Sequence, residues 1–331
     1  MIADSDRKLH VPLDWEAAAA EIFERRLRKV LVIGGSAAGK SSFCRYLAEA
    51  LLARPADVAV VDADIGQSSL GPPTTVTLGY VTSPVDFSTV SPAAFYFVGS
   101  TGPIGRFLPL VIGTASLSRE AHATFVIIDT TGLVHGSGRV LKNYKIEAVR
   151  PDAIVAIERR NELAPIRMAN RHVPILKIKP SGRAHGKDDY EKIEVRRRSY
   201  ARHFAGAASV ELPFGSLTFQ RTLLFSGTPF ELDGAVRAER SSEGILIVGT
   251  PPAPPTDSKL LPAGFERNLL CGIADAAGRC LGLGIIERID FAAGTIALVT
   301  PVERDKIQII QFGDVYVTPE GGELGQIKWA W

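Results

Sequence analysis

Cysteine is scarce in this sequence, which contains Cys44, Cys271 and Cys280 among 331 residues. Their odd number and wide separation exclude a disulfide framework, and their spacing does not match a zinc site. No apolar run approaches the roughly 20 residues that a membrane-spanning helix needs. Residues 1–10 also lack the apolar core of a signal peptide. We therefore expect a cytoplasmic protein with reduced cysteines and no membrane association.

Charge of one sign is not in excess, because 38 Lys and Arg residues oppose 36 Asp and Glu residues and leave a net charge of +2. Overall charge thus does not indicate a nucleic-acid-binding protein, and such a role would need a local basic patch. Hydrophobic residues make up 46% of the chain and charged residues 22%, which is typical of a globular protein. The length predicts two domains of roughly 100–200 residues each.

Short apolar runs alternate with helical patterns through the first two thirds of the chain. Helices are expected over Asp14–Arg28, capped by Asp14, and over Ser41–Leu52. This alternation predicts an α/β fold, a parallel sheet with helices on both faces. The expected strands are Val30–Ile33, Val58–Val61, Phe95–Val98, Phe125–Ile128, Ala153–Ile157 and Ile175–Ile178.

A basic segment at about 180–206 is rich in Lys, Arg and His and contains no strand pattern. The pattern of expected secondary structure changes after it. From residue 207 onward, closely spaced strand-like runs are separated by turns that carry Gly, Asp or Pro. We therefore predict a first domain over 1–206 and a smaller, all-β C-terminal domain over 207–331.

The segment that follows the first expected strand matches the phosphate-binding pattern G-x-x-x-x-G-K-[ST] and leads directly into a helix. In that context, backbone N–H groups and the helix N-terminus bind phosphate. Lys40 would contact the β- and γ-phosphates, and the Ser41 hydroxyl would ligate Mg²⁺. The sequence thus predicts a P-loop NTPase fold that binds ATP and Mg²⁺. The residues expected to bind the nucleotide are Gly34, Gly35, Ser36, Ala37, Ala38, Gly39, Lys40, Ser41 and Ser42.

Two strand ends carry carboxylates that could hold Mg²⁺ or prepare a nucleophile. Asp62 and Asp64 follow one strand at a spacing that puts both on the same side of an extended chain. Asp129 ends another strand and begins Asp129-Thr-Thr-Gly132, which also resembles the D-x-x-G switch of GTPases. The guanine-reading N/T-K-x-D motif does not occur in the chain, which disfavours a GTPase.

Four segments in order resemble the polynucleotide 5′-hydroxyl kinase family, above all its short archaeal forms. Besides the P-loop, 62–67 (DADIGQ) is similar to the D-x-D-x-G-Q motif, 97–103 (FVGSTGP) to F-x-G-S-T-x-P, and 128–138 (IDTTGLVHGSG) to I-[ND]-T-x-G-W-V-x-G-x-G. The match covers roughly residues 11–206. The resemblance implies transfer of the γ-phosphate of ATP to the 5′-hydroxyl of a polynucleotide, with RNA favoured over DNA as the acceptor.

The resemblance also implies roles for individual residues. Lys40, Asp64, Arg198 and Arg202 would be catalytic, with Asp64 as the base that activates the hydroxyl and the two arginines, one helical turn apart, as lid residues. Arg196 and Arg197 compete for the lid assignment. Mg²⁺ would be held by Ser41, Asp62 and Asp64. The acceptor would meet Gln67, Thr101, Pro103, Thr130 and Gly132.

Leu133 departs from the family pattern, since it stands where eukaryotic members have a tryptophan that stacks on a terminal nucleotide. The identity of the acceptor is therefore less secure than phosphoryl transfer itself. Three other functions stay open at this stage: a non-catalytic ATP-binding scaffold of an RNA-processing complex, a GTPase or ATPase switch, and a kinase acting on a small metabolite. The sequence leaves protein partners and oligomeric state undetermined.

Overall fold

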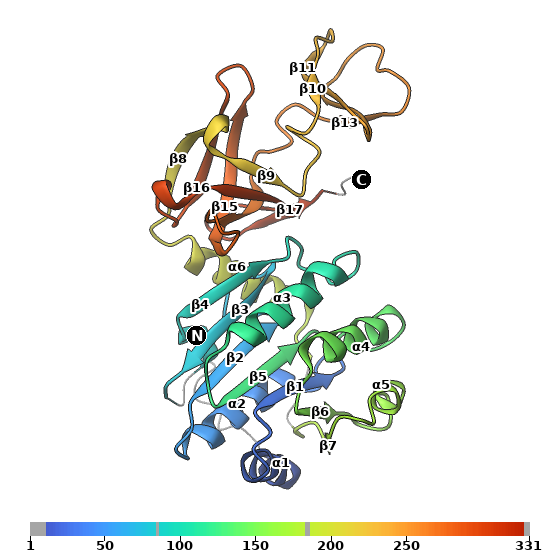
Figure 1. Ribbon diagram of the computed structural model, residues 1–331, viewed down its shortest axis with the longest axis vertical. Helices are drawn as coiled ribbons and strands as arrows, with labels where there is room; N and C mark the ends of the chain where they lie inside the picture. Colours follow the sequence, from blue (N-terminus) through green and yellow to red (C-terminus); the bar gives the residue numbers. More distant parts are fainter. Residues whose placement is uncertain (1–10, 84–85, 183–185, 328–331) are drawn as a thin grey trace. The chain divides into compact units, whose positions relative to one another are not determined.

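The computed structural model describes residues 11–83, 86–182 and 186–327 (Figure 1). The predictions made for residues 1–10 and for 183–185 of the basic segment lie outside this part of the chain. Contacts between residues divide the chain into two compact units, 1–196 and 197–331. The sequence-based boundary between residues 206 and 207 stays a prediction about domains.

The first unit contains the α/β portion of the chain. Its elements are α1 Leu13–Glu24, β1 Lys29–Gly34, α2 Lys40–Leu52, β2 Val58–Ala63, β3 Thr75–Val81, β4 Pro92–Phe97, α3 Phe107–Glu120, β5 Phe125–Thr130, α4 Ser137–Val149, β6 Ala153–Ile157, α5 Ala164–Ala169, β7 Ile175–Ile178 and the start of α6 Asp189–His203. All six strands expected before residue 180 are present, and the α/β class is confirmed.

The sheet of this unit is mixed rather than wholly parallel. Its strands lie in the order β4-β3-β2-β5-β1-β6-β7, and β3 runs antiparallel to both of its neighbours. No strand was expected at β3, and the expected parallel sheet was wrong in this respect. Two antiparallel steps turn β4 back to the direction of β2. As a result, the carboxyl ends of β1, β2, β4 and β5 lie at the same end of the sheet.

Helices cover both faces of the sheet, as predicted (Figure 1). On one face, α1 and α2 pack Trp15 and Phe43 edge to face, with ring centroids 5.2 Å apart. On the other face, α3, α4 and α5 contribute Leu110, Leu141 and Ile166 to a second buried cluster. The central strands β1, β2, β5 and β6 are therefore buried on both sides, which explains their continuous hydrophobic runs.

Two details of α1 differ from expectation. The helix ends at Glu24 rather than Arg28, and Pro12 occupies the N-cap position without a side-chain cap. The predicted capping role of Asp14 is wrong. Its carboxylate instead accepts a 2.6 Å hydrogen bond from the backbone N–H of Lys179, just after β7. Among the described helices, none combines the length and apolarity needed to cross a membrane.

The second unit is rich in strands, as expected for an all-β domain. Its strands are β8 Ala208–Pro213, β9 Thr218–Gln220, β10 Thr228–Pro229, β11 Ala235–Ser241, β12 Gly244–Gly249, β13 Ser258–Leu261, β14 Leu269–Ala274, β15 Cys280–Asp290, β16 Thr295–Thr300, β17 Ile309–Val317 and β18 Glu323–Gln326. One run pairs in the order β18-β17-β14-β15-β16-β8, and β10-β11-β12-β13 form a separate small sheet.

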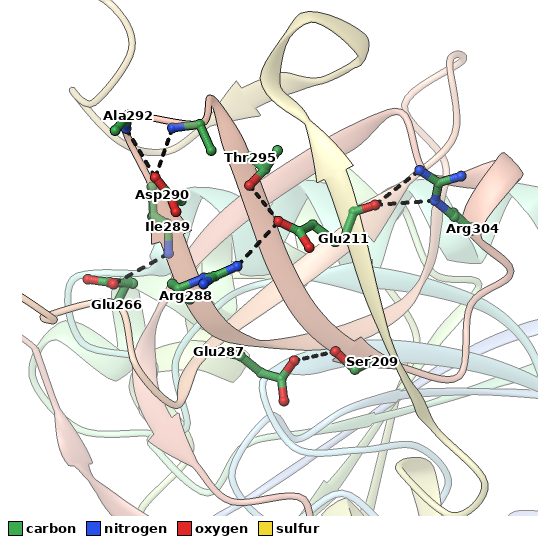
Figure 2. A network of polar contacts seen from close by, with 11 residues as sticks. Ser209, Glu211, Glu266, Glu287, Arg288, Ile289, Asp290, Ala292, Thr295 and Arg304 are labelled. Carbon is green, nitrogen blue, oxygen red and sulfur yellow. Dashed lines mark hydrogen bonds and ion pairs between the residues drawn. The ribbon is translucent and has the colours of Figure 1, made fainter.

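Polar contacts reinforce the pairing of strands β8, β15 and β16 of this unit (Figure 2). The carboxylate of Glu211 accepts hydrogen bonds from Thr295 at 2.7 Å and from Arg288 at 3.3 Å. The backbone carbonyl of Glu211 accepts two more from the Arg304 guanidinium, at 3.2 and 3.1 Å. These bonds link three segments that are distant in the sequence and help fix their register.

Candidate functional site

The P-loop connects β1 to α2, as the motif predicts. Gly39 at the N-cap of α2 has a φ of 85°, and Ala37 has a φ of 58°, so the loop turns through the left-handed region at two places. The backbone of this loop is thereby folded so that its N–H groups can line an anion site at a helix N-terminus. Lys40 is buried, and its ammonium donates to the Gly35 carbonyl at 3.0 Å.

The Ser41 hydroxyl donates a 2.5 Å hydrogen bond to Oδ2 of Asp129, at the end of β5. Burial, together with the nearby charge of Asp62, raises the pKa of Asp129 to about 7, although Lys40 and the hydrogen bond from Ser41 oppose the shift. A hydroxyl and a carboxylate in contact beside a phosphate loop are the ligand types that Mg²⁺ uses in such proteins. Asp129 was expected as a strand-end carboxylate, but it was not among the predicted site residues.

Asp62 organises the loop that follows β2. Its side chain is buried, and Oδ1 accepts from the backbone N–H of Asp64 at 3.0 Å. Oδ2 accepts four bonds, from the hydroxyl of Ser68, from both the N–H and the hydroxyl of Ser69, and from the N–H of Leu70, at 2.6–3.1 Å. Burial raises the pKa of Asp62, and these bonds oppose that shift. Both oxygens are thus engaged in holding residues 64–70.

Asp64 is oriented by its own loop and is only half-buried. Oδ1 accepts from the N–H groups of Gly66 at 3.3 Å and Gln67 at 3.1 Å, while no donor to Oδ2 occurs among the described residues. The amide nitrogen of Gln67 donates to Gly66 O at 2.7 Å and to Lys192 O, on α6, at 3.3 Å. Its Oε1 is buried without a partner in the described part of the chain. One carboxylate oxygen is therefore available to a hydroxyl or to water, and one buried amide oxygen beside it lacks a donor in the described part of the chain.

Close backbone approaches bring the four motif segments together in two pairs. A Cβ at Gly66 would lie 2.6 Å from the Thr101 carbonyl oxygen, so the 64–67 loop lies directly against the loop after β4. A Cβ at Gly132 would lie 2.8 Å from Ser36 Cα, so the loop after β5 lies directly against the P-loop. Side chains at these two positions would push neighbouring backbone apart, which explains why both motifs carry glycine.

The remaining predicted residues differ in their placement. Thr130 is fully buried, and its hydroxyl donates to the Val32 carbonyl at 2.8 Å, which ties β5 to β1. Pro103 follows Thr101 in the loop after β4, and its carbonyl accepts from Arg106 N–H at 2.9 Å. Arg198 and Arg202 lie one turn apart on α6, within the second compact unit. Their assignment as lid arginines, like that of Arg196 and Arg197, stays a prediction.

Two buried lysines were not anticipated. Lys142 and Lys145 of α4 are both fully buried, which is rare for lysine. Burial lowers the pKa of Lys145 to about 7, and Asp64, Asp129 and Asp62 oppose that shift. Burial also lowers the pKa of Lys142, and the charges of Lys145 and Lys40 lower it further. The only signal in the sequence was that both lysines fall on the helix face that carries Leu141, Ile146 and Val149.

Within the described ranges, no cluster of three or more His, Cys, Asp or Glu residues could hold a metal on protein ligands alone. Mg²⁺ is commonly bound through one or two carboxylates, a hydroxyl, water and substrate phosphates. The pair of Ser41 and Asp129, beside a phosphate loop, fits that kind of site.

The chain is similar to known proteins in both sequence and fold. A family model described as mRNA cleavage and polyadenylation factor CLP1 P-loop matches residues 34–206. The polyribonucleotide 5′-hydroxyl-kinase of Pyrococcus furiosus is 34% identical to this chain over 339 aligned positions, which cover 95% of each protein. The corresponding protein of Methanocaldococcus jannaschii is 30% identical, covering 98% of this chain and 97% of its own. Human polyribonucleotide 5′-hydroxyl-kinase Clp1 is 29% identical over 46% of this chain and 40% of its own.

Two solved structures of Clp1p with Pcf11p are similar in fold. Their TM-scores are 0.61 and 0.64, at 12% sequence identity, and each match covers 90% of this chain and 78% of the other. At this identity the likeness concerns the fold alone. It agrees with a P-loop α/β portion followed by further strands.

Proposed function

Because this chain belongs to the family described as mRNA cleavage and polyadenylation factor CLP1 P-loop, we propose that it is an ATP-dependent polyribonucleotide 5′-hydroxyl kinase. The near full-length relatives carry that activity in their names, and they match this chain from the P-loop unit through the β-rich unit. The observation that carries the proposal is the convergence of four loops at one end of the sheet, with Oδ2 of Asp64 available for a hydroxyl.

In this mechanism, the acceptor is the 5′-hydroxyl of an RNA strand. Asp64 accepts the proton of that hydroxyl, and the resulting oxygen forms a bond to the γ-phosphorus. The bond between the γ-phosphorus and the β–γ bridging oxygen breaks, so that ADP leaves. Lys40 and the P-loop N–H groups stabilise charge on the transferring group and on the leaving phosphate. Arg198 and Arg202 would supply further positive charge from α6.

Magnesium, when bound, would neutralise phosphate charge and orient the γ-phosphate. We propose Ser41 and Asp129 as the protein groups that hold it, because they already contact each other beside the P-loop. Asp64, with Gln67 next to it, would hold a water of the ion. Asp62, whose oxygens accept five hydrogen bonds, would act on the site through its loop.

The acceptor would enter beside the loop after β4. Gln67 Oε1, with no partner among the described residues, would accept a hydrogen bond from water or from a sugar hydroxyl. Thr101 and Pro103 line the other side, because Gly66 brings their loop within van der Waals contact. Gly132 closes the site against the P-loop and keeps the nucleotide next to the acceptor.

The test is an acceptor panel of 5′-hydroxyl RNA, DNA and duplexes, with ATP labelled at the γ-phosphate. Wild type should label RNA, whereas Asp64→Asn should lose activity and still bind ATP. Asp57→Asn is the matched control, because this exposed carboxylate lies just before β2, at its opposite end. Tight ATP binding with no labelled acceptor would indicate a non-catalytic scaffold instead. Equal activity of wild type and Asp64→Asn would remove Asp64 from the role of base.

A further inference from the structure

Helix α4 presents two buried lysine side chains to the ends of β2 and β5. Nζ of Lys142 donates to the carbonyl and the hydroxyl of Thr131, at 2.6 and 3.1 Å. Nζ of Lys145 reaches the carbonyl of Ala63 at 3.5 Å. Ala63 directly precedes Asp64, and Thr131 directly precedes Gly132. The two lysines thus reach the backbone next to the proposed base and next to the loop that lies against the P-loop.

The two lysines differ in how well they are satisfied. An ammonium group has three donors and no acceptor. Lys142 uses two donors in good hydrogen bonds, whereas Lys145 has one long contact in the described part of the chain. Among the described residues, neither has a carboxylate within salt-bridge distance. A fully buried, poorly satisfied ammonium is expected to destabilise a fold, so packing alone does not account for Lys145.

The surrounding charges indicate what Lys145 acts on. Asp64, Asp129 and Asp62 all lie close enough to stabilise its charged form, and Asp64 has the largest effect. Three carboxylates at one end of a sheet repel one another, and a buried cation behind them offsets that repulsion where water cannot. Because Lys145 is fully buried, it cannot itself contact RNA or nucleotide.

We propose that Lys145 is a positioning residue for the kinase reaction, which holds the end of β2 and the charge of Asp64 in the arrangement that the acceptor hydroxyl requires. Lys142 does the same for the end of β5 through two hydrogen bonds, and it also stabilises the fold. This inference rests on the proposed function. The proposal distinguishes the two lysines. Lys145 should increase the catalytic rate while it destabilises the fold, whereas Lys142 should contribute to both catalytic rate and stability.

The test compares Lys145→Met and Lys142→Met with wild type, and measures kcat, KM for ATP, KM for 5′-hydroxyl RNA, and Tm. Methionine keeps most of the volume and removes the charge. For Lys145→Met we expect kcat to fall by about 10–100-fold, the range that small misplacement of a reacting group produces. Both KM values should stay within about threefold of wild type, since the lysine contacts neither substrate. Its Tm should equal or exceed that of wild type, while the Tm of Lys142→Met should fall.

Two further variants complete the experiment. Lys145→Arg, which keeps the cation, should retain more kcat than Lys145→Met. Lys177→Met is the matched control, because it removes a lysine charge from β7, on an exposed side chain, and should leave kcat unchanged. Wild-type protein that cannot phosphorylate RNA would overturn the proposed function and this inference with it.

With active wild type, three results would overturn the inference alone. These are unchanged kcat in Lys145→Met, a loss of kcat accompanied by matching losses of Tm and ATP affinity, and failure of the variant to fold. Each result would mean that Lys145 either only stabilises the fold or has no role, and that it does not position Asp64.

Discussion

Replacing Asp62 by asparagine separates two roles for this residue, loop organiser and magnesium ligand. The substitution keeps shape and removes charge. The four bonds to Oδ2 would change from charged acceptors, worth about 1.5–3 kcal/mol each, to neutral ones, worth about 0.5–1.5 kcal/mol each. If the amide oxygen keeps those four donors, the amide nitrogen faces the Asp64 N–H, which leaves that donor unpaired at a further ~1–3 kcal/mol.

Relief from burying a charge offsets part of this loss. We therefore expect Asp62→Asn to destabilise the first unit by about 2–4 kcal/mol, and to lower its Tm by about 5–15 °C. Thermal unfolding followed by circular dichroism measures the shift, and titration of activity with Mg²⁺ gives the second readout. Asp64→Asn is the control, because its carboxylate makes only two long bonds within its own loop and should leave Tm nearly unchanged.

A different result would contradict the role of Asp62 as the organiser of its loop. If Asp62→Asn unfolds within about 2 °C of wild type but requires far more Mg²⁺ for activity, Asp62 is a metal ligand and the loop does not depend on its charge. The original sequence-based assignment of Asp62 to Mg²⁺ would then stand, and the assignment of Asp129 would lose its advantage.

Three further predictions concern close backbone contacts and one histidine. Gly132→Ala should weaken ATP binding about 10-fold or more, since its Cβ would displace P-loop backbone, whereas Gly215→Ala, which has open space around it and lies outside the motif segments, should not; calorimetric titration with ATP compares them. Gly66→Ala should raise KM for RNA and lower kcat, while the same Gly215→Ala control should change neither in steady-state assays. Burial lowers the pKa of His203 from 6.5 to about 4, so stability is full above pH 6.5 and falls as pH drops toward 4, by at most about 3 kcal/mol. Melting curves of His203→Gln between pH 4 and 7 should lack that decline, and an identical decline in both proteins would assign it to other groups.

Much of the fold followed from short-range patterns in the sequence. Six strands of the first unit were predictable because most of them are continuous apolar runs, and α2 was predictable because it follows directly from the P-loop motif. Strand β3 was not predicted because it follows two prolines and contains Gly79, so that no long apolar run indicates a strand there. The antiparallel direction of β3, and hence the mixed sheet, depends on pairing between segments that local patterns do not specify.

The candidate site could be predicted only in part from the sequence. The motif glycines indicated the loops, but not that Gly66 and Gly132 touch the loops of other motifs. The engagement of Asp62 depends on how residues 68–70 fold back toward it, which spacing alone does not reveal. Lys142 and Lys145 look in the sequence like ordinary helix surface, because lysine on a helix is usually exposed.

The common direction of β1, β2, β4 and β5 has a practical consequence. All four chemistry-bearing loops leave one end of the sheet, so the connections at the other end, 53–57 before β2 and 121–124 before β5, carry none of the proposed chemistry. Those two connections are where a fluorescent reporter or an affinity handle could be spliced into the chain while turnover is followed. Insertions into the loops at 99–103 or 131–136 are instead expected to abolish kinase activity.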